Sequence, residues 1–282
     1  MKVGIVQLEA QPGSAAIEHN RDQACRSVKN LFGKGASLVV LPECTHYQYF
    51  PDSSAMLNEL AEPLTGPSVQ RWSELAASYR GYIVGGILEK DSDGIYNTAV
   101  LIGPRGLVGR YRKLHRFGWE REWLLAGNEL PVFDLPSLGA RIGLLICYDL
   151  RFSEAITQLT LAGIDLLAVP TAWTSIGKRV LWDQYGYCPQ NHLAVGHAYA
   201  HHIAVVCADR VGREGDVTFR RSSIAVQPGG EVAIGPLDGH QTAAVIADLH
   251  IEGSRDKRIG TAGNLLRDRR SECYKVTPVS EC

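Results

Sequence analysis

The sequence lacks several features that would assign this chain of 282 residues to a class at once. No apolar run approaches the roughly 18 residues that a membrane-spanning helix needs. Met1 is not followed by the basic and then apolar pattern of a signal peptide. The 29 lysines and arginines almost balance the 30 aspartates and glutamates, so the charge gives no basis for binding nucleic acid or an anionic membrane. We therefore expect a cytoplasmic protein.

Paired cysteines are also absent. The cysteines number seven, which is odd, and they are scattered without a CxxC pair. In a reducing compartment this pattern predicts free thiols, and it argues against a disulfide framework or a structural zinc site.

Apolar runs typical of strands alternate with helical patterns, and this alternation predicts an α/β fold. No linker, low-complexity run or short repeat divides the chain, so we expect one domain. The predicted strands are 2–8, 37–41, 81–89, 96–103, 107–111, a run ending at 147, 165–173, 203–207, 222–227 and 242–248. The predicted helices are 15–31, 68–79, a segment opening at 153, and 181–202 with a break at Pro189. Residues 255–282 form a polar, basic tail.

Cys147 lies at the boundary between an apolar run and a polar segment. It ends the apolar run 141–147, polar Tyr148 and Asp149 follow, and Ser153 opens a helical pattern. A side chain between a buried strand and a helix faces the crevice where α/β sheets bind ligands. The alternative is an inert buried thiol, which is the usual fate of a free cysteine.

Two charged residues occupy comparable positions. Glu43 follows the strand 37–41, and Lys113 follows the strand 107–111. A carboxylate at the end of a buried strand is costly unless it is hydrated, paired or used in chemistry. A glutamate in a surface loop is the alternative interpretation of Glu43.

A thiol nucleophile needs a base and a group that stabilises the oxyanion, and two sets of residues offer them. The first pairs Cys147 with a histidine, as in thiol proteases. The second uses Glu43 as the base and Lys113 as the cation for the oxyanion. Their positions after strand ends favour the second set, but spacing does not decide between them. The candidate histidines are His115, His192, His197, His201 and His202.

Metal and phosphate sites are disfavoured by the same sequence. His197 and His201 are spaced i, i+4, yet no acidic residue completes an HExxH motif, so packing or a subunit contact is the better interpretation. The paired glycines at 85–86 and 229–230 open no helix with the spacing of a phosphate-binding loop.

Three motifs together resemble the nitrilase superfamily of carbon–nitrogen hydrolases. They are Leu41-Pro-Glu43, Tyr111-Arg-Lys113-Leu-His115 and Leu145-Ile-Cys147-Tyr-Asp-Leu-Arg-Phe152. The resemblance extends over nearly the whole chain, with further similar segments at 96–99, 170–173, 211–215, 222–224 and 228–231. Ser153 stands where many relatives carry proline, and Ala126 replaces a proline that often precedes Gly127.

The resemblance implies a four-layer αββα sandwich formed by residues 1–282 as a single domain. It implies a catalytic triad of Glu43, Lys113 and Cys147, and a second glutamate for which Glu120 matches best and Glu122 is the alternative. It also implies a homodimer or higher homo-oligomer. The helix around 193–200 and the tail 255–282 are the candidate subunit contacts.

The activity implied is cysteine-dependent hydrolysis of a small-molecule carboxamide to an acid and ammonia, through a thioester and with no metal or organic cofactor. After Cys147, the residues Tyr148 and Asp149 resemble the amidase and carbamoyl-hydrolase branches, because nitrilases proper typically have Trp-Glu there. An N-carbamoyl amidohydrolase, a nitrilase and a non-enzymatic binding scaffold are the alternatives. We expect the pocket to include Trp119, Tyr148, Arg151 and Trp173, although residues 174–191 fit the family pattern less well.

Overall fold

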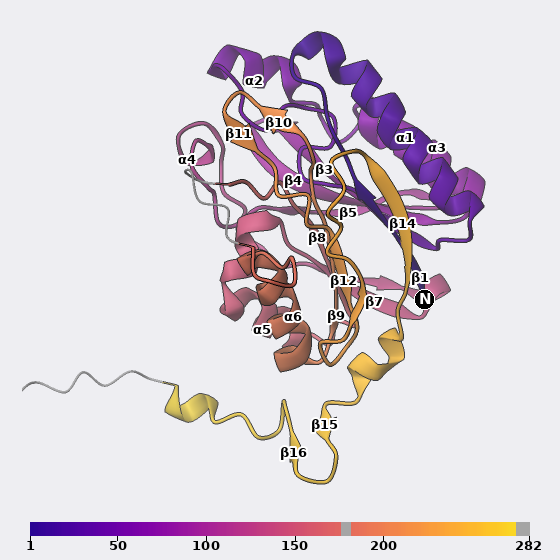
Figure 1. Cartoon of the computed structure of the whole chain (residues 1–282), viewed down its shortest axis with the longest axis vertical. Coiled ribbons are helices and arrows are strands. Elements are labelled where there is room, and N and C mark those ends of the chain that lie inside the picture. The colour runs from indigo at the N-terminus through magenta and orange to yellow at the C-terminus, as the bar shows by residue number, and fades with distance from the viewer. Residues whose placement is uncertain (176–181, 275–282) are drawn as a thin grey trace, which may run out of the picture.

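The computed structural model describes residues 1–175 and 182–274, and it has the predicted four-layer αββα arrangement. Two six-stranded sheets pack against each other, and each carries a pair of helices on its outer face. Figure 1 shows the layers in order, with α1 and α3 on one side and α5 and α6 on the other. Among the described helices, none is both long and apolar enough to cross a membrane.

The first sheet combines three adjacent parallel strands with one antiparallel strand on one side and two successive antiparallel strands on the other. Its strands, from edge to edge, are β14 (Ala243–Asp248), β1 (Lys2–Gln7), β2 (Leu38–Val40), β3 (Tyr82–Asp91), β4 (Gly94–Gly103) and β5 (Gly106–Arg112). Because β5 is antiparallel to β4, and β4 to β3, the carboxyl ends of β2 and β5 lie at the same edge.

The second sheet has parallel strands at its centre and antiparallel strands at both edges. Its strands, in spatial order, are β13 (Val232–Ile234), β12 (Ile224–Val226), β9 (Ala204–Ala208), β8 (Leu166–Pro170), β7 (Ala140–Leu144) and β6 (Val132–Leu135). The carboxyl ends of β7, β8 and β9 share one edge, and the chain that carries Cys147 leaves the sheet there.

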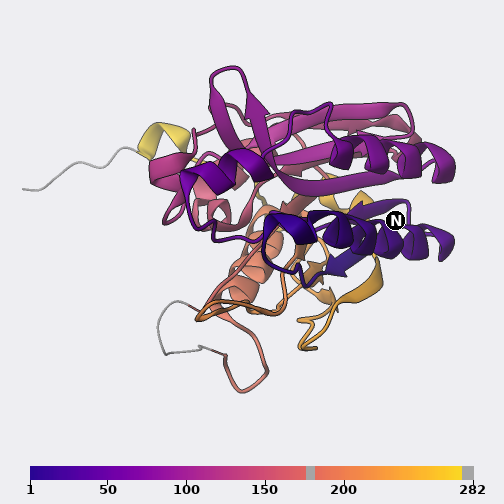
Figure 2. The ribbon, with the colours of Figure 1, turned by 90° about the horizontal axis from the view of Figure 1, so that it is seen from above.

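Helices α1 (Ile17–Gly33) and α3 (Pro67–Tyr79) cover the first sheet, and Figure 2 shows them side by side from above. Helices α5 (Ser153–Leu161) and α6 (Pro189–His201) cover the second sheet. The short elements are α2 (Ser54–Leu60), α4 (Glu120–Trp123), β10 (Arg213–Glu214), β11 (Val217–Thr218), β15 (Arg258–Ile259), β16 (Gly263–Asn264) and five 3-10 turns: η1 (Ser14–Ala16), η2 (Pro136–Leu138), η3 (Cys147–Arg151), η4 (Ile251–Arg255) and η5 (Ser271–Cys273).

The largest hydrophobic core joins the inner faces of both sheets. Val40 and Val84 of the first sheet and Ala168 and Val206 of the second belong to it, and all four are fully buried. Each buried valine contributes on the order of 1.5–3 kcal/mol relative to an exposed one. This core fixes the two sheets relative to each other, and with them the loops that leave their edges.

The predicted helix over 181–202 is wrong in its first part. Helix α6 starts at Pro189, which suits a first helical position because proline lacks the N–H that has no partner there. Before it, the Asp183 carboxylate accepts hydrogen bonds from the backbone N–H groups of Tyr185 and Tyr187 and holds a turn. Residue 181 of this prediction, and 275–282 of the predicted tail, lie outside the described residues.

Candidate active site

The two sheets contribute different parts of one buried site. Glu43 follows β2 and Lys113 follows β5, both in the first sheet, whereas Cys147 follows β7 of the second. Glu43 is fully buried, Lys113 is 1% exposed and Cys147 is 8% exposed. The strand ends therefore meet as the sequence predicted, although β7 stops at Leu144 and Cys147 opens the 3-10 turn η3.

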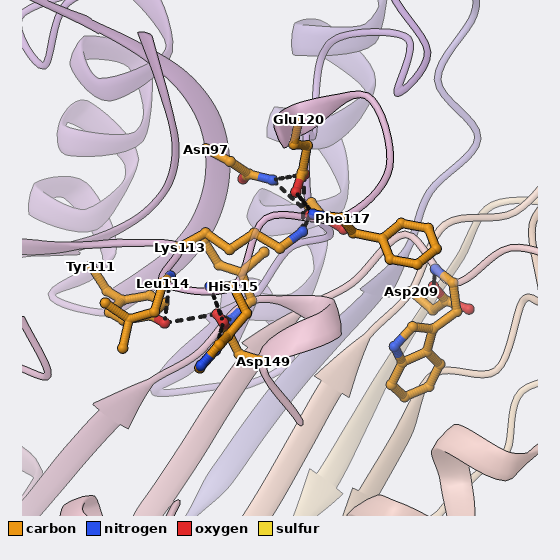
Figure 3. Close-up of polar contacts among 12 residues, drawn as sticks. Asn97, Tyr111, Lys113, Leu114, His115, Phe117, Glu120, Asp149 and Asp209 are labelled. Atoms are coloured by element: carbon orange, nitrogen blue, oxygen red, sulfur yellow. Dashed lines mark hydrogen bonds and ion pairs between the residues drawn. The ribbon is translucent and has the colours of Figure 1, made fainter. Parts of the chain in front are cut away.

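Lys113 binds two carboxylates at once. Its Nζ lies 2.8 Å from Glu43 Oε1 and 2.9 Å from Glu120 Oε1, and Asn97 Nδ2 donates to the same two oxygens at 2.7 Å each. Figure 3 shows Lys113 and Asn97 both directed at Glu120. Glu120 Oε2 accepts a hydrogen bond from the Phe117 backbone N–H at 2.7 Å. Glu120 is thus the second glutamate of the cluster, and Glu122 is exposed to solvent.

The carboxylates determine the charge of the lysine. Burial alone would lower the pKa of Lys113, but the negative charges of Glu120 and Glu43 outweigh burial and raise it well above its ordinary value. Burial also raises the pKa of Glu120, and the neighbouring ammonium of Lys113 opposes that rise. The site therefore holds a permanent cation whose position is fixed by charge-assisted hydrogen bonds.

The Cys147 thiol keeps its proton in the resting site. Burial, and next the charge of Glu43, raise the pKa of this thiol well above its ordinary value, while Lys113 and the backbone of Ala172 lower it less. A thiolate nucleophile consequently needs a base beside it. Glu43 Oε2 is buried and has no hydrogen-bond partner among the described residues, which leaves this oxygen free to accept the proton.

Close backbone contacts hold Glu43 in place. Gly86 of β3 exchanges hydrogen bonds with the Glu43 loop, since its N–H donates to the Pro42 carbonyl at 3.1 Å and its carbonyl accepts from Thr45 at 3.0 Å. A Cβ at Gly86 would lie 2.7 Å from the Cα of Glu43. The loop can approach β3 this closely only because residue 86 is glycine.

Cys147 has a left-handed backbone, with φ of 46°. For a residue other than glycine this conformation costs on the order of 1–2 kcal/mol. It persists because the surrounding structure fixes the turn, and it makes the chain reverse sharply between β7 and α5.

The candidate histidines bind elsewhere among the described residues. His115 Nδ1 lies 2.8 Å from Asp149, and its ring stacks on Phe152 at 3.5 Å. His192 contacts Asp183, and His197 contacts the Leu150 carbonyl. His201 contacts Thr157, and His202 contacts the Asp256 carbonyl. Apart from burial, the groups that shift the pKa of the Cys147 thiol most are Glu43, Lys113 and the backbone of Ala172, and no histidine of the described chain is among them.

A cavity opens beside the thiol and is lined mainly by apolar and aromatic side chains. Tyr148, Arg151 and Trp173 line it, as the sequence predicted, together with Tyr49 and Phe117. The predicted residue Trp119 is not among the described lining residues. Its ring packs against Tyr49 and Trp123, each at 5.9 Å between ring centroids, and Phe117 occupies the cavity wall instead.

The described part of the chain contains no group of three or more histidine, cysteine, aspartate or glutamate side chains arranged to hold a metal ion. The rings of His197 and His201 are neighbours on α6, at 5.5 Å between centroids, but the nearest polar atoms belong to Leu150 and Thr157.

Comparisons with known proteins agree with this arrangement. The carbon–nitrogen hydrolase family matches residues 2–258. The chain belongs to this family, within the nitrilase superfamily, and is a hydrolase that acts on carbon–nitrogen bonds.

Particular relatives cover both chains almost completely. A nitrilase of Pyrococcus abyssi is 32% identical, and the match covers 97% of this chain and 99% of that protein. The omega-amidase NIT2 of Homo sapiens is 30% identical, and the match covers 98% of this chain and 97% of that protein. Among solved structures, a mutant of the Nesterenkonia AN1 amidase from the nitrilase superfamily superposes with a TM-score of 0.78. It is 23% identical and covers 96% of this chain and 95% of its own.

Proposed function

We propose that the protein hydrolyses a small-molecule carboxamide to the carboxylic acid and ammonia, with Cys147 as the nucleophile. The observation that supports this most directly is the free Glu43 Oε2, buried next to a protonated thiol and beside the ammonium of Lys113. These three groups supply a nucleophile, a base and a fixed positive charge in a site that excludes most water.

In the first half of the reaction, Glu43 takes the thiol proton and the Cys147 sulfur attacks the amide carbon. The carbonyl oxygen becomes an oxyanion, which Lys113 and the backbone N–H of Tyr148 stabilise. Tyr148 is the second residue of η3, where an N–H has no acceptor within the helix. Each such donor typically contributes about 10²–10³ in rate.

In the second half, Glu43 donates its proton to the leaving nitrogen, and ammonia departs from a thioester. Glu43 then accepts a proton from water as that water attacks the thioester. The carbon–sulfur bond breaks, the proton passes from Glu43 to the sulfur, and the carboxylic acid leaves the restored Cys147 thiol. Glu120 remains a carboxylate throughout and holds Lys113, because both of its oxygens already accept hydrogen bonds. No metal or organic cofactor takes part.

The choice of an amide over a nitrile rests on the oxyanion site and on the residues after Cys147. An amide gives an sp³ oxyanion that needs donors, whereas a nitrile gives a thioimidate nitrogen that must be protonated. Tyr148 and Asp149 follow Cys147 where nitrilases proper have Trp-Glu. Relatives named omega-amidase support the same choice, although one relative of similar identity is named nitrilase.

A matched panel of substrates tests this proposal. Purified protein is incubated with the amide, N-carbamoyl and nitrile derivatives of the same acyl or amine groups, and ammonia and carbon dioxide are measured. We expect ammonia without carbon dioxide, and fastest from an amide. A nitrile turned over faster than its matching amide contradicts the proposal. Carbon dioxide released in equal amount to ammonia from the best substrate makes the protein an N-carbamoyl amidohydrolase, and no turnover in any series favours a binding scaffold.

A further inference from the structure

A further buried carboxylate, Asp149, lies beside Tyr111 and His115 (Figure 3), and its side chain makes four polar contacts. Its Oδ1 accepts from the His115 backbone N–H at 3.0 Å and lies 2.8 Å from His115 Nδ1. Its Oδ2 accepts from the Tyr111 hydroxyl at 2.7 Å and from the Ile146 backbone N–H at 3.0 Å. All of these partners are available as hydrogen donors, and none is a residue of the proposed triad.

The partners of Asp149 flank both reacting groups. Tyr111 and His115 stand two residues before and two residues after Lys113: Tyr111 is near the end of β5 of the first sheet, and His115 is on the chain that leaves it. Ile146 and Asp149 stand on either side of Cys147, on the chain that leaves β7 of the second sheet. One carboxylate thus connects the lysine segment to the nucleophile turn.

The direction of the Tyr111 hydrogen bond is fixed by its surroundings. The hydroxyl oxygen accepts from the Leu114 backbone N–H at 3.2 Å, so its own hydrogen is left for Asp149. Burial, and next the charge of Asp149, raise the pKa of Tyr111, and the hydroxyl remains a donor. The stacking of the His115 ring on Phe152 likewise connects the lysine segment to residues just after the nucleophile turn.

We propose that Asp149 is a positioning residue that sets the location of Lys113 relative to Cys147, and that Tyr111 and His115 act with it. It touches neither substrate nor reacting atom. Its carboxylate fixes the turn that gives Cys147 its left-handed backbone and ties that turn to the chain on both sides of Lys113. This inference rests on the proposed function for its effect on turnover, but not for its effect on the thiol.

The test is Asp149→Asn, which keeps the shape but replaces one acceptor oxygen by an NH₂ group. Whichever of the two oxygen positions the NH₂ group takes, it faces hydrogen-bond donors, so the contacts made at that position are lost. The first measurement is the rate of Cys147 alkylation by iodoacetamide near pH 8, followed on the Cys147 peptide by mass spectrometry. The second is kcat and KM for the amide that the unmodified protein hydrolyses fastest. We expect the alkylation rate and kcat to fall at least about ten-fold, with KM changed less than about three-fold.

Asp165→Asn is the matched control. Asp165 is 5% exposed, accepts from the Arg141 backbone N–H at 2.9 Å and precedes β8, at the opposite end of the same sheet. We expect this variant to lower the melting temperature but to keep both rates within about two-fold. If Asp149→Asn keeps both rates within that range, or if Asp165→Asn loses as much as Asp149→Asn, the positioning role is refuted.

Tyr111→Phe makes the test independent of whether Asp149→Asn folds. It removes one hydroxyl from the same network, and we expect both rates to fall about three- to five-fold. Unchanged rates in Tyr111→Phe, when Asp149→Asn does not fold, also refute the proposal. If the unmodified protein hydrolyses no amide, the proposed function fails, but the alkylation rates still decide the role of Asp149.

Discussion

Glu43 and Glu120 each accept hydrogen bonds from the same two nitrogens, Nζ of Lys113 and Nδ2 of Asn97. They differ in their second oxygens. Glu120 Oε2 is bound to the Phe117 backbone N–H, and Glu43 Oε2 has no partner among the described residues. The two carboxylates therefore suit different tasks: one is held in place, and the other is free to exchange a proton.

The first prediction follows for the base. Glu43→Gln keeps the side-chain shape but loses the proton acceptor, so kcat/KM for the best amide should fall by about 10²–10⁴. His115→Asn should be far milder, because His115 contacts Asp149 and Phe152 and lies behind the site. Steady-state kinetics of both variants give the comparison. The reverse ranking would favour a thiol–histidine mechanism.

The second prediction separates two glutamates of the short helix α4. Glu120→Gln removes a buried charge that holds Lys113, and should lower kcat by about 10²-fold or more. Glu122→Gln is the control on the same helix, since Glu122 is exposed, and its kcat should be unchanged. Equal losses in the two variants would contradict the structural role given to Glu120.

The third prediction concerns the nucleophile. Cys147→Ala should abolish turnover and leave the circular dichroism spectrum and the subunit assembly unchanged. Cys25→Ala is the control, because Cys25 is a half-buried thiol on α1, away from the candidate site, and this variant should keep its activity. Substantial hydrolysis by purified Cys147→Ala protein would remove Cys147 from the mechanism.

The fourth prediction concerns Asp209, which follows β9 and lies behind the cavity wall. Its fully buried carboxylate accepts from Thr171 Oγ1 at 2.9 Å, from the Trp173 N–H at 2.8 Å and from the Ser222 N–H at 3.0 Å. Burial nevertheless raises the pKa of Asp209 from 3.8 to about 6. At a pH between these two pKa values, Asp209 is protonated in the folded state and ionised in the unfolded state.

The stability contributed by Asp209 is therefore fully present below about pH 4 and is lost as the pH rises through about 6. On acidification from neutral pH to pH 5, the unmodified protein should gain about 1 kcal/mol of unfolding free energy relative to Asp209→Asn. Melting temperatures of both proteins at the two pH values measure this difference. A gap between them that does not change with pH would contradict the raised pKa.

The fifth prediction is a dimer. Tyr199 on α6 is 71% exposed, and Ile259 and Tyr274 of the tail are 57% and 62% exposed, so apolar side chains face outward on the elements expected to form the contact. In Figure 1 the segment from β15 to η5 extends away from the sheets. Sedimentation at micromolar concentration should give twice the mass of one chain. The Tyr199→Glu variant should give a mass closer to that of a single chain. A single-chain mass for the unmodified protein would contradict the prediction.

The apolar runs predicted the α/β class and placed Glu43, Lys113 and Cys147 after strand ends, because a buried strand is visible as an apolar run that stops at a charged or reactive residue. The four layers and the choice of these three residues over a cysteine–histidine pair were implied by the family resemblance. The sequence did not identify Asn97, which lies inside a predicted strand. Its role depends on the pairing of β4 with β5, through which Lys113 N–H donates to the Asn97 carbonyl at 2.9 Å.

The sequence predicted no special role for Gly86, a turn or strand glycine within 81–89, because the loop that needs its missing side chain belongs to a distant part of the sequence. Trp119 was chosen for the cavity over Phe117, because periodicity does not determine side-chain direction in an irregular connection. The cytoplasmic location and the single-domain organisation of residues 1–282 stay predictions.

The base and the ammonium come from one sheet and the thiol from the other, so the reactive arrangement does not exist until the two sheets have docked. During synthesis the first sheet lacks its β14 edge and has no nucleophile beside Glu43, while the thiol emerges later in a segment without its base. An incompletely folded chain therefore lacks an assembled candidate active site. If the proposed function holds, the newly made protein is expected not to attack amides in its surroundings, and hydrolytic activity is expected to report completed folding.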